Sequence, residues 1–251
     1  MDGSLVEEVA ARVRRRWPHL RVDVTPPSSF AFVSDGLAIQ VHVENLRARL
    51  ATCVDSVSRE RELAAFVDSV EPAVDRRPGR VEDLIATLRP RETVDQGLRG
   101  CVSRPLAGDL VAVYGFDSPT GTRFTPPSAF AALGLSDPAR LHEVALANLA
   151  ARLPPADAFE DLPGCPGVYV REVDPLESDR LLLPAHWPVI EEALGGAMLA
   201  SAPARGVLLI AAPAQVDRLF DATQVIAKRH PAPLGRAILR WTPQGWRVNL
   251  L

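Results

Sequence analysis

Hydrophobic and polar residues follow two different periods in the first seventy positions of the chain. Apolar residues recur every three or four positions up to Trp17, with arginines and glutamates between them, which is typical of an amphipathic helix that Pro18 ends. Apolar and polar residues then alternate on both sides of a Ser34-Asp35-Gly36 turn, which predicts a β-hairpin. The predicted elements are a helix at 5–17, strands at 22–24, 30–32 and 37–43, and helices at 44–53 and 58–70.

The residues at 71–80 break this pattern. They include two prolines, a glycine and three arginines, a composition that is typical of a linker. We therefore expect two domains, an N-terminal α-β-β-β-α unit at 1–75 and a larger domain at 80–251.

The larger domain mixes helices and strands without a regular βαβ repeat. The run at 110–114 is continuously apolar, which predicts a strand in a sheet that is covered on both faces. Asp137 and Pro138 stand where a helix N-cap and first position are expected. The pattern favours α+β, with a mainly antiparallel sheet, over a doubly wound α/β fold. The predicted elements are strands at 110–114, 168–170, 198–201, 207–211, 238–241 and 246–250, and helices at 125–134, 138–153, 187–194 and 213–229.

Composition limits the partners and the location of the protein. The 251 residues are 47% hydrophobic and carry a formal net charge of −3, without the basic excess that is usual in nucleic-acid binders. The first eight residues include three acidic ones, unlike a secretory signal, and the longest apolar run, at 207–214, is too short to span a bilayer. We expect a cytoplasmic protein that binds neither nucleic acid nor a membrane.

The common catalytic and cofactor signatures are absent from the sequence. Lys228 is the only lysine and no phosphate-binding loop precedes it, and there is no G-x-S-x-G or G-x-G-x-x-G motif. His142-Glu143 begins like a helical zinc motif, but position 146 is leucine. The three cysteines are far apart and form no CxxC pair. We therefore predict no metal site, no catalytic residue and no cofactor.

Two polar segments each allow two interpretations. Cys165 lies in a Gly-Cys-Pro-Gly turn and is either a structural loop cysteine, which we favour, or an exposed nucleophile. The carboxylates between 172 and 179 are flanked by Arg171 and Arg180 and are either a solvated loop, which we favour, or oxygen ligands for a cation.

Asn148 stands out because it lies on the apolar face of the helix at 138–153, four residues after Val144. A buried amide must find hydrogen-bond partners. We expect Asn148 either to bond a neighbouring strand or loop, which is the favoured role, or to contact a ligand.

Three short segments beyond residue 80 form a pattern in order and spacing: Ala147-Asn148-Leu149 with Leu153-Pro154, then Arg180-Leu181-Leu182, then Ser201-Ala202-Pro203 with the apolar strand at 207–210. This pattern resembles the bacterial YtpQ-like family, a domain of unknown function. The resemblance implies a bacterial protein of about this length with no assigned activity, cofactor or catalytic residues. This sequence departs from the family pattern at two positions: it has Asp179 where the pattern has serine, and Gly206 where the pattern has aspartate. Asn148 and Arg180 match the pattern.

These observations support two functional hypotheses. The first is a non-catalytic binding or protein-interaction module, because no reactive constellation is visible and the order of elements in the N-terminal unit resembles that of small protein-docking modules. The alternative is an enzyme with an anion-binding site at the junction of the two units, formed by Asn148 and Arg180 with Asp117 or Arg205.

Overall fold

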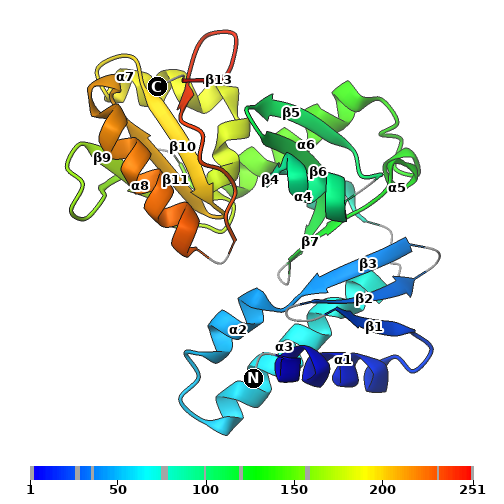
Figure 1. Ribbon diagram of the computed structural model, residues 1–251. Coiled ribbons are helices and arrows are strands. Elements are labelled where there is room, and N and C mark those ends of the chain that lie inside the picture. The colour runs from blue at the N-terminus through cyan, green and yellow to red at the C-terminus, as the bar shows by residue number, and fades with distance from the viewer. Residues whose placement is uncertain are drawn as a thin grey trace. The chain divides into compact units, whose positions relative to one another are not determined.

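The structure is a computed structural model. It describes residues 3–25, 29–34, 37–74, 79–98, 100–118, 121–155, 159–230 and 232–249. The chain divides into two compact units, which are described separately (Figure 1). Unit 1 comprises Met1–Pro78 with Ser118–Arg123, and unit 2 comprises Gly79–Asp117 with Phe124–Leu251. Residues 71–74 of the predicted linker are helical instead, because the helix that begins at Ser56 continues to Val74, and residues 75–78 lie outside the described residues, as do Asp35 and Gly36 of the predicted turn.

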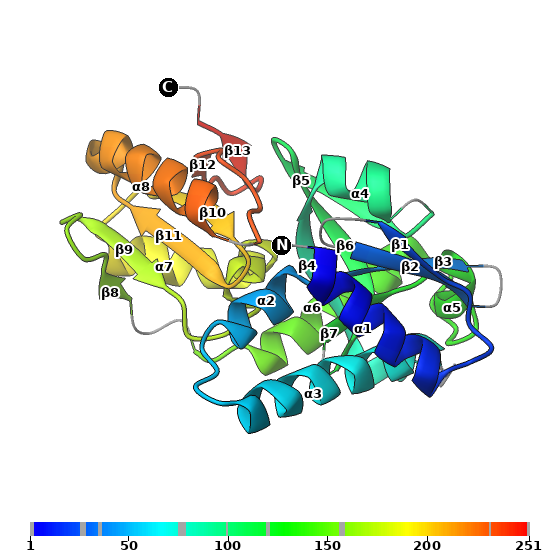
Figure 2. The same cartoon turned by 60° about the horizontal axis from the view of Figure 1, so that its bottom comes forward.

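Unit 1 is a three-stranded antiparallel sheet with helices packed on it. The strands follow the order β1-β2-β3, and Phe30 and Phe32 of β2 both point into the core, with ring centroids 6.5 Å apart. Figure 2 shows α1 beside α3, and the two helices contact each other. The α-β-β-β-α prediction is confirmed. The elements are α1 Gly3–Arg16, β1 Val22–Thr25, β2 Ser29–Ser34, β3 Leu37–His42, α2 Glu44–Leu50 and α3 Ser56–Val74.

Unit 2 begins with a four-stranded sheet that carries α6 on one face. The strands follow the order β4-β6-β5, with β7 also paired to β6; residues 121–123 of β7 are counted with unit 1 in the division above. The α6 helix has the predicted N-cap, because the Asp137 carboxylate accepts hydrogen bonds from the backbone N–H groups of Ala139 and Arg140. The elements are η1 Val81–Asp83, β4 Leu84–Pro90, α4 Arg91–Gly97, β5 Ser103–Ala107, β6 Leu110–Ser118, β7 Gly121–Phe124, α5 Pro127–Ala131 and α6 Pro138–Arg152.

Both faces of β6 are covered, as its apolar run predicts. Residues 110–116 of this strand are buried without alternation. In contrast, β5 and α4 are not among the predicted elements. The β5 strand contains Pro105 and three exposed residues, so it lacks the apolar alternation that makes a strand visible in a sequence. At the entrance to unit 2, a Cβ atom on Gly79 would overlap the Phe116 ring, so only glycine fits there.

The second half of unit 2 is a six-stranded sheet with the order β13-β12-β10-β11-β9-β8. The α8 helix packs on β10 and β11. The predicted strand pair and terminal hairpin are confirmed, and every strand pairing whose register is defined in the described residues is antiparallel. The elements are β8 Glu160–Asp161, β9 Val168–Arg171, η2 Glu177–Leu182, η3 Pro184–His186, α7 Trp187–Ala193, β10 Leu199–Ala204, β11 Val207–Ala211, η4 Pro213–Gln215, α8 Val216–Arg229, β12 Leu239–Arg240 and β13 Arg247–Val248.

The short 3₁₀ helix η2 connects the two sheets of unit 2. It contacts β4 of the four-stranded sheet and both β10 and β11 of the six-stranded sheet. Its Leu181 carbonyl accepts a hydrogen bond from the Trp246 indole at 2.8 Å, and Trp246 packs edge-on against Trp187. The polar residues of η2 therefore lie in the middle of unit 2.

Candidate functional site

All six residues of η2 are buried, although the first four are Glu177, Ser178, Asp179 and Arg180. Their exposed fractions are 0, 1, 2 and 0%. Charged side chains are rarely buried unless they are paired and hydrogen-bonded, so each of these must have partners within unit 2. These partners define what the cluster is able to do.

Glu177 lies between two arginines. Its Oε1 atom is 2.8 Å from Nε of Arg171 and 2.5 Å from Nε of Arg180. Both guanidinium groups also reach backbone carbonyls, since Arg171 donates to Pro155 O at 2.7 Å and Arg180 donates to Pro154 O at 2.8 Å. The three side chains thereby fix the chain after α6 to η2.

The remaining contact of Arg180 is with His186. Nη1 of Arg180 donates to Nδ1 of His186 at 2.9 Å, so this histidine accepts as a neutral ring. Burial and the neighbouring Arg180 charge both lower the pKa of His186. Every nitrogen of the Arg180 guanidinium group thus has an internal partner, which supports a structural role for this residue.

Asp179 bonds the edge strand of the four-stranded sheet. Its Oδ1 atom accepts the Leu88 backbone N–H at 2.7 Å, and the Thr87 hydroxyl also hydrogen-bonds the carboxylate. Burial raises the pKa of Asp179 to about 6, although Arg89, these hydrogen bonds and Arg205 all act in the opposite direction. The carboxylate therefore occupies the position on β4 that a further strand would otherwise fill.

Asn148 and Asp117 are held by other partners. The Asn148 amide donates to the carbonyls of Val81 and Leu84, at 2.7 and 2.9 Å, which links α6 to the start of β4. Asp117 forms an ion pair with Arg152 at 2.6 Å. Of the two roles predicted for Asn148, these contacts favour the structural one.

Arg205 is the one predicted site residue whose side chain has no hydrogen bond or ion pair in the described part of the chain. It is partly exposed in the turn between β10 and β11, and its backbone N–H bonds Ala232 O. The next residue, Gly206, has a φ of +75° and donates its N–H to Ser178 Oγ at 3.2 Å. Gly206, one of the two departures from the YtpQ-like pattern, is therefore bonded to the residue that precedes Asp179, the other departure.

The sequence did not indicate Arg89, which lies near Arg205. Arg89 is 8% exposed, and its Nη1 atom donates to Thr87 Oγ1 at 2.9 Å and to the Leu88 carbonyl at 2.5 Å. Its guanidinium carbon lies 4.9 Å from the centre of the Phe124 ring. Burial and repulsion from Arg205 lower the pKa of Arg89 to about 10, with Asp179 opposing the change. From the strand pattern alone, Arg89 would be expected at a solvent-exposed end of β4.

The favoured interpretation of the acidic segment as a solvated loop is wrong for its second half. Glu172 is exposed, but Glu177 and Asp179 are buried with arginine neighbours. The alternative cation site finds no support, because no group of three His, Cys, Asp or Glu residues suited to a metal ion occurs within the described residues. Cys165 directs its Sγ atom to the Arg218 carbonyl at 3.7 Å, consistent with the favoured loop cysteine.

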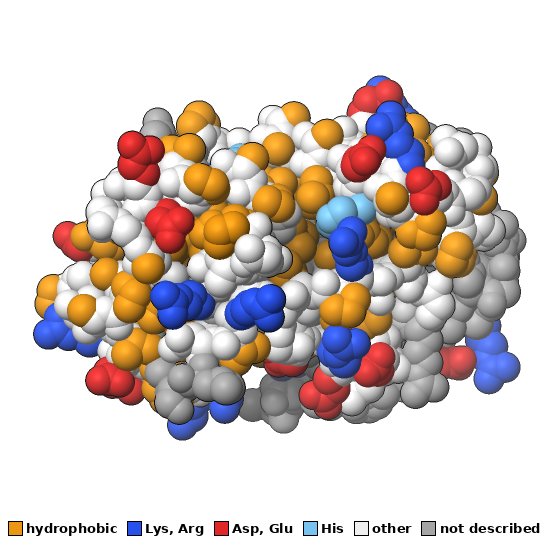
Figure 3. All heavy atoms as spheres, turned by 90° about the horizontal axis from the view of Figure 1, so that it is seen from above, with side chains coloured by type: hydrophobic (Ala, Val, Ile, Leu, Met, Phe, Trp, Pro, Cys, Tyr) orange, Lys and Arg blue, Asp and Glu red, His pale blue; other side chains and the backbone are white. Residues whose placement is uncertain are grey.

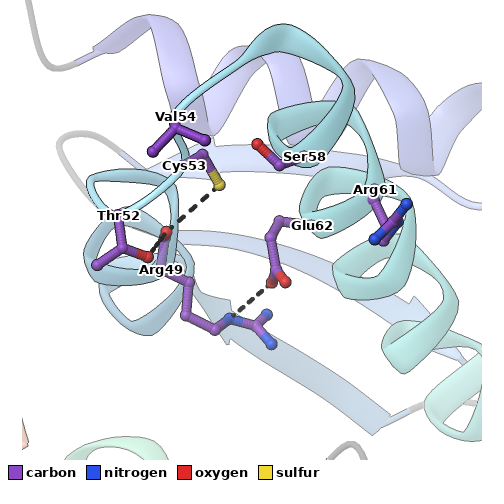
Figure 4. Close-up of a pocket in the computed structure, with 7 residues that line it drawn as sticks. All are labelled: Arg49, Thr52, Cys53, Val54, Ser58, Arg61 and Glu62. Atoms are coloured by element: carbon purple, nitrogen blue, oxygen red, sulfur yellow. Dashed lines mark hydrogen bonds and ion pairs between the residues drawn. The ribbon is translucent and has the colours of Figure 1, made fainter.

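Unit 1 contains an open pocket of about 290 Å³ between the end of α2 and the start of α3 (Figure 4). We call it the α2–α3 pocket. Nε of Arg49 lies 3.4 Å from Oε2 of Glu62, and the Cys53 thiol donates to the Arg49 carbonyl at 3.5 Å. The pocket is lined by Arg49, Thr52, Cys53, Val54, Ser58, Arg61 and Glu62.

The most exposed large hydrophobic residue of the described chain lies at this pocket. Val54 is 94% exposed, and Val57, three positions further along, is 67% exposed. Arg61 is also exposed, and no ion pair or hydrogen bond of its side chain occurs in the described residues. The pocket thus combines exposed apolar surface with a cation that has no ion-pair partner in the part of the chain that the structure describes.

Comparisons of the chain with protein-family models, with curated proteins and with solved structures found no match. The YtpQ-like resemblance stays a prediction. Among the described helices, none has the length and apolar character needed to cross a membrane.

Proposed function

We propose that this chain is a non-catalytic, cytoplasmic protein-interaction module that binds a segment of a partner protein in the α2–α3 pocket. The observation that carries the proposal is the exposure of Val54 and Val57 beside that pocket. Exposed hydrophobic side chains beside a hollow offer apolar surface that a partner can cover.

The charges of the pocket indicate which chemical groups a partner needs in order to bind there. Arg49 is paired with Glu62, whereas Arg61 has no such partner among the described residues. A segment that places an aliphatic or aromatic side chain on Val54 and Val57 and a carboxylate near Arg61 complements both features. We therefore propose an acidic, partly apolar peptide segment as the ligand.

The charge distribution on one face of the molecule favours a protein over a nucleic-acid partner. On the face drawn in Figure 3, the basic side chains are interspersed with acidic, hydrophobic and uncharged atoms and form no continuous basic patch. The phosphate backbone of a nucleic acid is bound by a continuous basic surface.

The proposal is tested by selecting peptides from a random display library on the immobilised full-length protein. We expect enriched peptides to combine an acidic residue with an aliphatic or aromatic one. In fluorescence anisotropy, Arg61→Glu should lower the affinity for such a peptide at least about tenfold, since the substitution replaces attraction of the peptide carboxylate by repulsion. Replacing the acidic residue of the peptide by lysine should restore binding to this variant.

The matched control is Val189→Ser, because Val189 is also an exposed valine, at 64%, but belongs to α7 in unit 2. It should leave the affinity unchanged, whereas Val54→Ser with Val57→Ser should reduce it. An enriched peptide that binds all of these variants equally would overturn the proposal, as would a selection that enriches none.

A further inference from the structure

A second candidate site lies in unit 2, where η2 brings two arginines together. Ser178 accepts a hydrogen bond from the Gly206 backbone, and the adjacent Asp179 accepts one from the Leu88 backbone. Arg205 precedes Gly206 and Arg89 follows Leu88 in the sequence. Two hydrogen bonds to neighbouring residues of one helix therefore hold the backbones that carry these arginines.

The guanidinium group of Arg89 is only partly satisfied. Of its five N–H groups, those on Nη1 serve Thr87 and Leu88. Nε and Nη2 have no hydrogen-bond partner among the described residues, and neither atom is completely enclosed, although the residue as a whole is buried. These two nitrogens form the edge of the guanidinium group that binds carboxylates and phosphates through two parallel hydrogen bonds.

The charges around Arg89 are unbalanced. In the described residues neither Arg89 nor Arg205 forms an ion pair, and Asp179 is the acidic side chain whose charge acts on both. Two cations thus share one carboxylate, whose charge is itself opposed by burial. A buried cation without a close counter-ion is costly, and a bound anion would remove much of that cost.

We infer that Arg89 and Arg205 form a binding site for a small molecule that bears a phosphate or carboxylate group. The oxyanion would accept hydrogen bonds from Nε and Nη2 of Arg89 and from the Arg205 guanidinium group. Phe124, beneath the guanidinium plane, keeps Arg89 in position. The site belongs to unit 2 and uses no residue of the α2–α3 pocket, so each proposal is tested separately.

Titration calorimetry with the full-length protein tests this inference, with inorganic phosphate and succinate as separate probes at constant ionic strength. We expect one of the two to bind at one site per chain, and the comparison identifies the preferred group. Arg205→Gln should weaken this binding at least about tenfold, because it removes one charge-assisted partner. Arg205 is partly exposed and has no internal side-chain partner in the described residues, so the variant should fold.

Arg229→Gln is the matched control, since Arg229 is an exposed arginine at the end of α8 and its loss changes the net charge equally. This variant should bind the probe as the original protein does. The inference is overturned if neither probe binds more tightly than chloride, or if Arg205→Gln and Arg229→Gln weaken binding to the same extent. Arg89→Lys, which keeps the charge but lacks the two parallel donors, should also bind more weakly.

Discussion

At the scale of single residues, unit 2 is organised around charges that water does not reach. Glu177 has two arginine partners within 2.8 Å, whereas Asp179 has only hydrogen bonds and more distant cations. Two carboxylates two positions apart on one 3₁₀ helix therefore have opposite surroundings. Glu177 is held by direct ion pairs, while burial makes the proton of Asp179 harder to remove.

Asp179 should make unit 2 less stable as the pH rises. Its pKa is about 6 in the folded protein and 3.8 in an unfolded chain, so the folded state binds the proton more tightly. Stability from this group is therefore fully present below pH 4 and is lost as the pH rises to about 6. The difference of about two pH units corresponds to roughly 3 kcal/mol.

The measurement is urea unfolding at pH 4.5 and pH 7, compared between the original protein and Asp179→Asn. Asparagine does not titrate, so the variant should lack this pH-dependent contribution. Relative to the original protein, the free energy of unfolding of the variant should therefore be higher at pH 7 than at pH 4.5. Equal differences at both pH values would contradict the assignment. Glu172→Gln, which alters an exposed carboxylate nearby, serves as the control.

At the scale of elements, polar side chains fasten the helices of unit 2 to the edge of a sheet. Asn148 joins α6 to η1 and β4, and Asp179 joins η2 to β4. Both side chains bond backbone groups of the edge strand, which would otherwise stay unpaired. The edge of the four-stranded sheet is thus closed by side chains instead of by another strand.

Replacing Asn148 by alanine should separate its structural role from a ligand contact. The variant loses two hydrogen bonds to backbone carbonyls, so we expect its unfolding free energy to fall by about 2 kcal/mol. Binding of the phosphate or succinate probe should not change. Glu143→Ala on the exposed side of the same helix should alter stability by less than about 0.5 kcal/mol. A loss of probe binding without a loss of stability would instead favour the ligand contact.

At the scale of the whole molecule, each unit has its own hydrophobic core. The core of unit 1 consists of buried residues between Val6 and Val70, and the cores of unit 2 consist of residues from Leu84 onward. Three of the four tryptophans, Trp187, Trp241 and Trp246, pack together in unit 2. Their fluorescence therefore reports on the folding of unit 2.

We expect core substitutions to affect the unit that contains them. Leu63 in unit 1 and Leu208 in unit 2 are both fully buried, so either change to alanine should cost about 2–5 kcal/mol. In a Trp17→Phe background, Leu208→Ala should shift the fluorescence-detected urea midpoint to lower concentration. Leu63→Ala should lower the helical circular dichroism midpoint while leaving the fluorescence midpoint in place. A fluorescence midpoint that falls equally in both variants would contradict separate cores.

Local patterns explain why most elements could be predicted. The alternation around the hairpin of unit 1, the N-cap at Asp137 and the apolar run of β6 each depend on residues close together in the chain, and each was confirmed. Short polar strands such as β5 lack such a pattern. The acidic residues before Arg180 were misread for a similar reason, because a charged sequence is solvated unless distant residues cover it.

The sequence by itself determined the α+β class and the order of the main helices and strands, because hydrophobic periodicity and helix caps act over a few residues. It also marked Arg205 as a candidate, but only the tertiary structure placed Arg89 near it. The proximity of these two arginines depends on contacts such as the hydrogen bond between Leu88 and Asp179, which are 91 positions apart in the chain. Burial of the charges in η2 likewise follows from two sheets that close around it, and no local pattern in the sequence encodes their approach.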